Sequence, residues 1–203
     1  MTQNWKEVVE TASGDVRRLS HVVRFSSIPV SVPENVAEHS FYVALYAIII
    51  HKTLRPNDVD IVGAIILGAI LHDLAEAKTG DVVRTFKYSS DALKKEIDKA
   101  EHVIISQFPA LILDIYNLHK HIESDDHAYV SSVIKAADFM SLHQYMVREI
   151  RRGNQEIYPF FLRMEADLES MAAIQNDLSS LYEELLRTAR KARNYITVMK
   201  CNP

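Results

Sequence analysis

Long stretches of periodic apolar residues run through this chain with little glycine or proline to interrupt them, and no other feature restricts the fold as strongly. Only five glycines and six prolines occur among 203 residues. Periodic apolar stretches of this length are typical of helices, and no segment shows the alternation of a half-buried strand. The sequence therefore predicts an all-α helical bundle. Its length fits a single domain with a core large enough to fold without disulfides.

Capping residues indicate where the helices begin and end. A short helix is expected at about residues 4–13, and Asp15 is expected to cap a second one. Asn35 is a good N-cap for a helix that runs to about residue 53, with Glu38 as its capping-box partner. Asp58 is expected to cap one continuous helix that ends at Gly80. A loop is expected at 81–89, and further helices at about 90–107, just after Pro109, at 130–152, and as one or two segments at 156–198.

The composition narrows the class of partner. The net charge is −4 and no basic run occurs, which argues against nucleic acid, because a nucleic-acid-binding face is rich in Lys and Arg. The most apolar segments, 41–50 and 61–71, are shorter than the ~20 residues that a membrane span needs, so no membrane association is expected. No signal peptide is apparent, and the single cysteine, Cys201, fits a reducing compartment. We therefore expect a cytoplasmic protein.

Three ionisable side chains follow the apolar segment 61–71. His72 and Asp73 adjoin, and Glu76 lies four residues after His72, so on a helix it projects from the same side. Charged groups at the end of a buried helix are costly unless something satisfies them, and a divalent metal ion would do so. Imidazole and carboxylate suit Zn, Mn, Fe, Co or Ni. A polar cluster that faces solvent is the alternative interpretation.

Two further residues extend this set. His39 lies in the first turn of a helix that soon becomes apolar, and Asp138 is a lone carboxylate among small and apolar residues. Each alone is weak evidence, since a core histidine is common. Together with His72 and Asp73 they provide two imidazoles and two carboxylates, a set that can hold one divalent ion and leave positions open for water and substrate. Such a site lowers the pKa of bound water and supports hydrolysis near neutral pH.

The order His, His-Asp, Asp resembles that of the HD-domain phosphohydrolase superfamily. Beyond it, the chain resembles the bacterial 5′-deoxynucleotidase branch and the related phage deoxyadenosine triphosphatases. The resemblance covers about residues 15–170, so a single HD domain is expected over 1–203, with a C-terminal helical extension at about 171–203. The segments that carry the resemblance are 22–25 (VVRF), 34–40 (ENVAEHS), 71–76 (LHDLAE), 79–81 (TGD), 87–88 (KY), 135–138 (KAAD) and 153–156 (GNQE).

This resemblance implies a role for each matching residue. Glu76 would be the acid or base beside the metal-bound water, with Asp81 near the scissile phosphate. Arg24 and Lys87 would contact phosphate. Phe25 stands where the branch often has Trp, and its ring would pack near the sugar and disfavour a 2′-hydroxyl. The metal ligands would be His39, His72, Asp73 and Asp138, holding one divalent transition metal ion.

The resemblance implies a metal-dependent hydrolase of 2′-deoxynucleotides, as a homodimer or higher homo-oligomer. We expect a 5′-deoxynucleotidase that forms deoxynucleoside and phosphate. The chain departs from the branch at 82–86 (VVRTF), where Pro-Thr-Pro is common, and Arg84 there could meet additional phosphates or face solvent. Release of triphosphate from a deoxynucleoside triphosphate, most plausibly dATP, therefore stays open. A non-catalytic nucleotide-sensing module and a cyclic-nucleotide phosphodiesterase are further alternatives. His119, His121 and His127 are interpreted as surface residues rather than ligands of a second metal.

Overall fold

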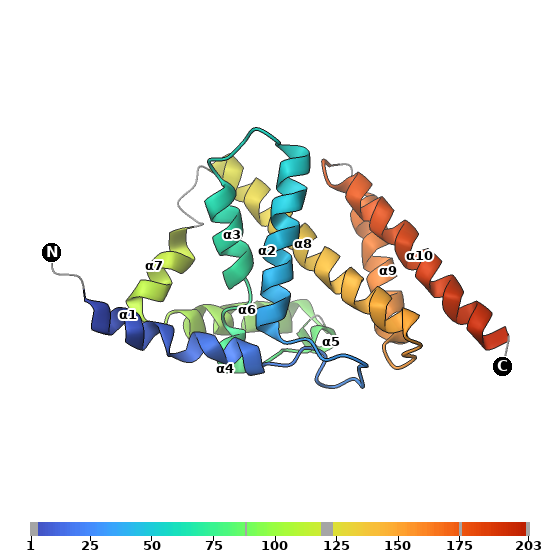
Figure 1. Cartoon of the computed structure of the whole chain (residues 1–203), viewed down its shortest axis with the longest axis horizontal. Helices are drawn as coiled ribbons and strands as arrows, with labels where there is room; N and C mark the ends of the chain where they lie inside the picture. The colour runs from blue at the N-terminus through green and yellow to red at the C-terminus, as the bar shows by residue number, and fades with distance from the viewer. Residues whose placement is uncertain (1–3, 88, 119–123, 175, 202–203) are drawn as a thin grey trace.

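The computed structural model describes residues 4–87, 89–118, 124–174 and 176–201, and within them the chain is all-α, as predicted (Figure 1). The only β-pairing among these residues is an isolated bridge between Val23 and Asn35. The helices are α1 (Trp5–Ala12), the 3-10 helix η1 (Asp15–His21), α2 (Val36–Leu54), α3 (Val62–Leu71), α4 (Glu76–Thr79), α5 (Arg84–Lys87), α6 (Asp91–Ile105), α7 (Ala110–Leu118), α8 (Ser124–Arg151), α9 (Tyr158–Ala172) and α10 (Ser179–Cys201).

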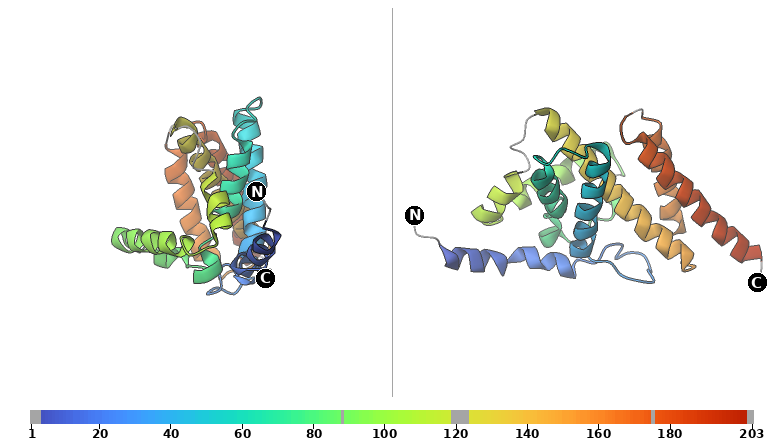
Figure 2. Two further views of the ribbon diagram at one scale, coloured as in Figure 1. Left: turned by 90° about the vertical axis from the view of Figure 1, so that its left-hand side faces the viewer. Right: turned by 45° about the horizontal axis from the view of Figure 1, so that its top comes forward.

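Helices α2, α3 and α8 pack against one another at the centre of the molecule. On the other side of α8, α9 and α10 pack as a pair, while α1 and α7 lie at the opposite end (Figure 1). The views in Figure 2 place α2 at one face of the molecule and α6 and α9 toward the other. The main core is formed between α2, α3 and α8 and continues to α9 and α10. A smaller core joins η1, the start of α2, the segment 71–77 and α7.

The start of α2 is fixed by the predicted capping box. The Asn35 side chain accepts a hydrogen bond from the Glu38 backbone N–H at 2.9 Å, and the Glu38 carboxylate accepts from the Asn35 backbone N–H at 3.1 Å. The other two predicted caps were wrong. Gly14, not Asp15, precedes η1, and Ile61, not Asp58, precedes α3, in both cases without a side-chain bond. Asp58 lies in a turn, where its carbonyl accepts from His51 Nε2 at 2.9 Å.

The predicted continuous helix over about 59–79 is broken between α3 and α4. From Leu71 to Ala77 the backbone bonds span three residues rather than four, as in Leu74 N–H to the Leu71 carbonyl and Glu76 N–H to the Asp73 carbonyl. This tighter winding rotates the side chains relative to a regular helix. It places His72 and Asp73 in the turn between α3 and α4, and Gly80 ends α4 with a positive φ of 72°.

One loop assignment also changed, because the expected loop at 81–89 contains the short helix α5. The segment expected as one or two helices at 156–198 forms two, α9 and α10. Among the described helices, none has a stretch that is both long and apolar enough to span a bilayer.

Candidate active site

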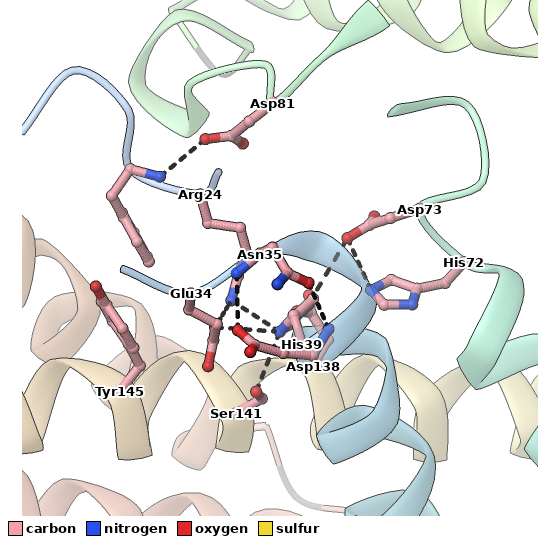
Figure 3. Close-up of polar contacts among 12 residues, drawn as sticks. Arg24, Glu34, Asn35, His39, His72, Asp73, Asp81, Asp138, Ser141 and Tyr145 are labelled. Carbon is pink, nitrogen blue, oxygen red and sulfur yellow. Dashed lines mark hydrogen bonds and ion pairs between the residues drawn. The ribbon is translucent and has the colours of Figure 1, made fainter. Parts of the chain in front are cut away.

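The four predicted metal ligands meet where α2, the α3–α4 turn and α8 approach one another (Figure 3). One ligand atom from each of His39, His72 and Asp138 lies within 4.8 Å of the others. His39 Nε2 is 3.1 Å from an Asp138 oxygen and 3.7 Å from Asp73 Oδ2. Asp73 Oδ2 is in turn 3.1 Å from His72 Nε2. Segments that are about 100 residues apart in the sequence therefore supply one set of two nitrogens and two carboxylates.

The two imidazoles present their Nε2 atoms to the centre of this set. His72 Nδ1 donates to the Ala69 carbonyl at 2.7 Å, which orients the ring with Nε2 toward the carboxylates. His39 Nδ1 lies 2.8 Å from Arg24 Nη1 and 3.1 Å from Ser141 Oγ, which leaves Nε2 as the ring nitrogen that faces the carboxylates. Both Nε2 atoms are buried, and each lies 3.1 Å from a carboxylate oxygen without the geometry of a hydrogen bond. Buried nitrogens that face two carboxylates in this way fit a divalent metal ion.

The charges of these groups are strongly coupled. Burial lowers the pKa of His39, and the Arg24 guanidinium lowers it further. Burial also opposes charge on His72, but the Asp73 and Asp138 carboxylates outweigh it and raise the pKa of His72 to about 9. For Asp73 and Asp138, burial favours the neutral acid, but the neighbouring imidazoles dominate and hold both pKa values below the usual range. The carboxylates are therefore ionised and ready to bind a cation.

Glu76 and Asp81 lie beside this set, and their pKa values are raised rather than lowered. Burial, together with the Asp73 and Asp81 carboxylates, raises the pKa of Glu76 to about 9. Burial likewise raises the pKa of Asp81 above its ordinary value. Asp81 Oδ2 accepts the backbone N–H of Phe25 at 2.9 Å (Figure 3). Because the pKa of Glu76 is raised while those of Asp73 and Asp138 are lowered, Glu76 can donate a proton while the two aspartates bind a cation.

The Arg24 side chain is held in place by a buried glutamate, Glu34. Its Nη1 donates to Glu34 Oε1 at 2.6 Å and lies 2.8 Å from His39 Nδ1. The backbone reinforces this pairing, because the Arg24 N–H donates to the Glu34 carbonyl at 2.9 Å. Both side chains are largely buried, with 13% and 7% of their surfaces exposed. The cation of Arg24 is thus fixed at the edge of the ligand set.

Phe25 has an unusual backbone conformation. Its φ of 58° is in the left-handed region, which is uncommon for a residue with a large side chain. Its ring stacks on Tyr145 with centroids 5.0 Å apart and planes inclined by 6°. The Tyr145 hydroxyl donates to the Val32 carbonyl at 2.9 Å. The Phe25 side chain, which we predict to select the sugar, is therefore held in place by its stacking on Tyr145 and by the hydrogen bond from its backbone N–H to Asp81.

The remaining cationic and histidine residues from the sequence differ in position. Lys87 faces the site but donates to Glu101 at 2.6 Å, so it is bound to α6. The side chain of Arg84 lies outside the described residues, as do His119 and His121. His127 is exposed on α8, as the sequence indicated.

One pocket contains the residues described above and continues well beyond them. It has an empty volume of about 1030 Å³, including space open to solvent. One end is lined by Arg24, Phe25, Asp73, Glu76, Asp81 and Asp138, and the other by Leu142, Met146, Phe160, Arg163, Met164 and Asp167. Asp138 lies within the pocket, where 36% of its side chain is accessible.

Sequence reasoning missed several residues of this site. Glu34 and Ser141 orient Arg24 and His39, and Tyr145 supports Phe25. Ser141 had a signal, because it follows Asp138 by three residues and so faces the same side of α8. The apolar end of the pocket had none, because α8 and α9 each read as ordinary core helices.

The chain is similar to known proteins over most of its length. Residues 13–196 match the family described as 5′-deoxynucleotidase YfbR-like. The chain is 31% identical over 152 residues to the 5′-deoxynucleotidase YfbR of Escherichia coli O127:H6, covering 71% of this chain and 75% of the relative.

Two solved structures are similar in fold. An HD-domain phosphohydrolase from Listeria innocua has a TM-score of 0.62 and 24% identity, over 91% of this chain and 96% of that one. The HD phosphohydrolase DatZ of cyanophage S-2L, bound to dA and one catalytic Zn²⁺ ion, has a TM-score of 0.54 and 18% identity, over 96% and 98%. The predicted HD-domain fold is confirmed.

Proposed function

The chain belongs to the YfbR-like family of HD-domain 5′-deoxynucleotidases, and we propose that it hydrolyses 2′-deoxynucleoside 5′-monophosphates to deoxynucleoside and phosphate. The observation that carries this proposal is the convergence of His39, His72 and Asp138, with Asp73 beside them, at a pocket that Asp73 and Asp138 line. Arg24 and Glu76 line the same end, so a phosphate there meets a cation and a proton donor.

His39, His72, Asp73 and Asp138 would hold one divalent metal ion. The buried Nε2 atoms of both histidines support this assignment, since each faces a carboxylate oxygen at 3.1 Å without the geometry of a hydrogen bond. When bound, the ion would supply positive charge for the phosphate oxygens and lower the pKa of water. The donor set suits Zn, Mn, Fe, Co and Ni.

The chain's own residues would bind the phosphate, transfer a proton and select the sugar. Arg24, fixed by Glu34, donates to the phosphate and neutralises its charge. Glu76, whose pKa burial raises, passes a proton to the leaving 5′-oxygen. Asp81 holds the backbone of Phe25, whose ring closes the space beside C2′ of the sugar. A 2′-hydroxyl buried against that ring would have no partner, which disfavours ribonucleotides. Lys87 lines the pocket, and a phosphate contact there requires it to share its charge with Glu101.

We also propose that two copies associate through the outer face of α2 and α3. The side chains of Phe41, Leu45 and Ile49 recur every fourth residue of α2 and are 63%, 42% and 48% exposed, and Ile70 of α3 is 43% exposed. No Asp, Glu, Lys or Arg occurs at 40–51 or 61–71. A helix that is apolar on all sides is normally buried. A membrane surface would require basic residues around the patch, whereas a self-complementary contact with a second copy requires no charge.

The association is tested by sedimentation of the wild-type chain and of Leu45→Asp. The proposal expects a dimer that the substitution converts to a monomer, because a buried carboxylate without a partner is costly. Leu45 does not line the pocket, so hydrolysis should persist. A monomeric wild type at high micromolar concentration would refute the proposed interface and leave the activity untouched. The cytoplasmic location stays a prediction.

The function is tested by a panel of deoxynucleoside mono- and triphosphates, ribonucleotides and cyclic nucleotides, with Mn²⁺ or Co²⁺ present. We expect phosphate release from deoxynucleoside monophosphates. Triphosphate released from dATP would instead support the triphosphohydrolase alternative, and cleavage of a cyclic phosphodiester alone would support a phosphodiesterase. Nucleotide binding with no turnover under any of these conditions would support the sensing module.

A further inference from the structure

One loop, at residues 25–33, carries part of the pocket wall. Three residues of this loop line the pocket: Phe25, Ser27 and Ile28. The two ends of the loop are joined by backbone pairing, since the Arg24 N–H donates to the Glu34 carbonyl at 2.9 Å. Inside the loop, the Ile28 N–H donates to the Phe25 carbonyl at 2.9 Å and forms a turn. The loop contains no helix or strand, so its position depends on contacts with other segments.

A buried carboxylate of α8 holds the far side of this loop. Glu149 is 0% exposed, and its Oε2 accepts the backbone N–H of Ser31 at 2.6 Å. The two residues are 118 positions apart in the sequence. Burial opposes charge on Glu149, but the hydrogen bonds that its carboxylate accepts, chiefly from Ser31, hold its pKa below the ordinary value. The fold therefore keeps a negative charge inside the protein here, which is costly unless the charge is well bonded.

The turn that follows α8 supplies a second bond to the loop. Asn154 Nδ2 donates to Glu149 Oε2 at 2.7 Å and to the Pro29 carbonyl at 2.9 Å. Asn154 Oδ1 accepts the Glu156 N–H at 3.0 Å, which fixes the orientation of the amide. Gly153 has a positive φ of 85°, a conformation that favours glycine, and the tight turn there brings Asn154 back toward the helix. The turn therefore attaches the loop to the end of α8.

Glu149 belongs to a row of α8 side chains that all support the site. Four residues with the spacing i, i+3, i+7 and i+11 lie along one face of the helix: Asp138, Ser141, Tyr145 and Glu149. Asp138 is a candidate metal ligand, Ser141 contacts His39, and the ring of Tyr145 stacks on the first residue of the loop (Figure 3). At 1.5 Å per residue, the row spans about 16 Å. A single helix thus fixes the loop relative to the candidate metal ligands.

We propose that Glu149 and Asn154 form a clamp on the loop 25–33, and that through this loop they support the discrimination against a 2′-hydroxyl. Both are positioning residues, because neither is among the residues that line the pocket. Asp81 fixes the backbone of Phe25 at one end of the loop, and the clamp fixes residues 29–31 at the other. Release of the clamp frees the loop to carry the ring away from the sugar. This inference rests on the proposed function, because it assumes that Phe25 borders the sugar.

The clamp is tested with Glu149→Met, which keeps the space filled but offers only a weak acceptor. The measurement is the ratio of kcat/KM for AMP to that for dAMP, which does not depend on the fraction of the protein that is folded. We expect this ratio to rise by about tenfold, limited by the original preference, while the bound metal is unchanged. Glu149→Gln keeps an acceptor oxygen and should change the ratio less.

A second variant covers the case in which Glu149→Met does not fold. Asn154→Ala removes the bonds to Glu149 and Pro29 from a side chain that is only partly buried, so its effect on stability should be smaller. It should raise the same ratio. Asn176→Ala is the matched control, because Asn176 lies in the turn between α9 and α10, where its side chain accepts the Leu178 N–H at 2.9 Å. The control should keep the wild-type ratio.

Amide hydrogen exchange tests the clamp without turnover. The Ser31 N–H should exchange about tenfold to a hundredfold faster in Glu149→Met than in the wild type, while amides in the middle of α8 keep their protection. Equal exchange would overturn the clamp. Faster exchange with an unchanged sugar ratio would overturn the positioning role, as would a wild type without a deoxy preference.

Failure of the proposed function gives a different result, because the wild type would then hydrolyse no deoxynucleoside monophosphate. In that case the ratio of the dissociation constants of AMP and dAMP, measured by calorimetry, replaces the ratio of kcat/KM. Tighter binding of dAMP than of AMP that Glu149→Met removes would support the clamp. Equal binding of the two nucleotides by the wild type would overturn it.

Discussion

The hydrogen bond between Asp81 and the backbone of Phe25 gives a sharp prediction about sugar selectivity. A left-handed conformation costs a residue with a side chain about 1–2 kcal/mol, and Phe25 adopts it with φ of 58°. Its N–H donates to Asp81 Oδ2 at 2.9 Å. A bond to a charged acceptor contributes about 1.5–3 kcal/mol. The bond is therefore large enough to offset the strain, and its loss should release Phe25 from this conformation.

Asp81→Ala should accordingly reduce discrimination against the 2′-hydroxyl. A partnerless hydroxyl costs on the order of 1–3 kcal/mol, so Phe25 should give a deoxy preference of roughly tenfold to a few hundredfold. Removing the bond that positions the ring should raise the ribonucleotide-to-deoxynucleotide ratio of kcat/KM by about tenfold, limited by the original preference. Asp81→Asn keeps an acceptor oxygen and should change the ratio less. Phe25→Ala should raise the ratio as Asp81→Ala does.

The assay is phosphate release from dAMP and AMP by each variant. Tyr145→Phe is the matched control, because it keeps the stacked ring and loses only the hydroxyl bond to the Val32 carbonyl. Its ratio should equal that of the wild type. A proton-transfer role for Asp81 would lower kcat for both sugars alike and leave the ratio fixed. That result in Asp81→Ala would refute the positioning role, and an unchanged ratio in Phe25→Ala would refute the sugar contact.

Three further predictions follow from the site and its support. Asp73→Asn and Asp138→Asn should each lower metal content and abolish turnover while the helical circular-dichroism signal persists; full activity with unchanged metal content would remove that residue from the site. Glu76→Ala should keep the metal and lose about 10²–10⁴-fold in kcat, whereas loss of metal and activity together would make Glu76 a ligand. Burial lowers the pKa of His143 to about 4 in the folded protein, below the ordinary value of about 6.5. As pH falls from about 6.5 toward 4, the unfolded chain binds a proton that the folded chain excludes, so the free energy of unfolding falls by up to about 3 kcal/mol. Urea unfolding of wild type and His143→Gln across this range should show the larger acid loss in the wild type, and parallel curves would contradict it.

Much of the fold could be predicted because its determinants are local. Asn35 and Glu38 form their capping box within four residues, so the sequence alone places the start of α2. The break after Leu71 could not be predicted in the same way. The segment 61–79 is a good helix by its apolar content, and the tighter turn lies where His72 and Asp73 approach residues of α2 and α8, a contact between distant segments.

The same distinction between local and long-range determinants applies to the residues of the site. The four candidate ligands could be proposed from sequence because their chemistry is costly in an apolar setting without a partner. Glu34 and Tyr145 act only through contacts with segments distant in the chain, which periodicity does not encode. Phe160 and Arg163 look like one core and one surface residue of an ordinary helix until α9 packs beside α8.

The central claim is that one divalent ion, held by His39, His72, Asp73 and Asp138, is required for hydrolysis of a deoxynucleoside monophosphate. The most direct measurement removes metal with a chelator and then titrates Mn²⁺ or Co²⁺ back while bound metal and phosphate release from a dNMP are recorded together. The account predicts that turnover rises in proportion to bound metal and reaches its plateau at one ion per chain, and that Asp138→Asn shows neither. Full turnover in the metal-free protein, or tight binding of one ion with no gain in phosphate release, would contradict it.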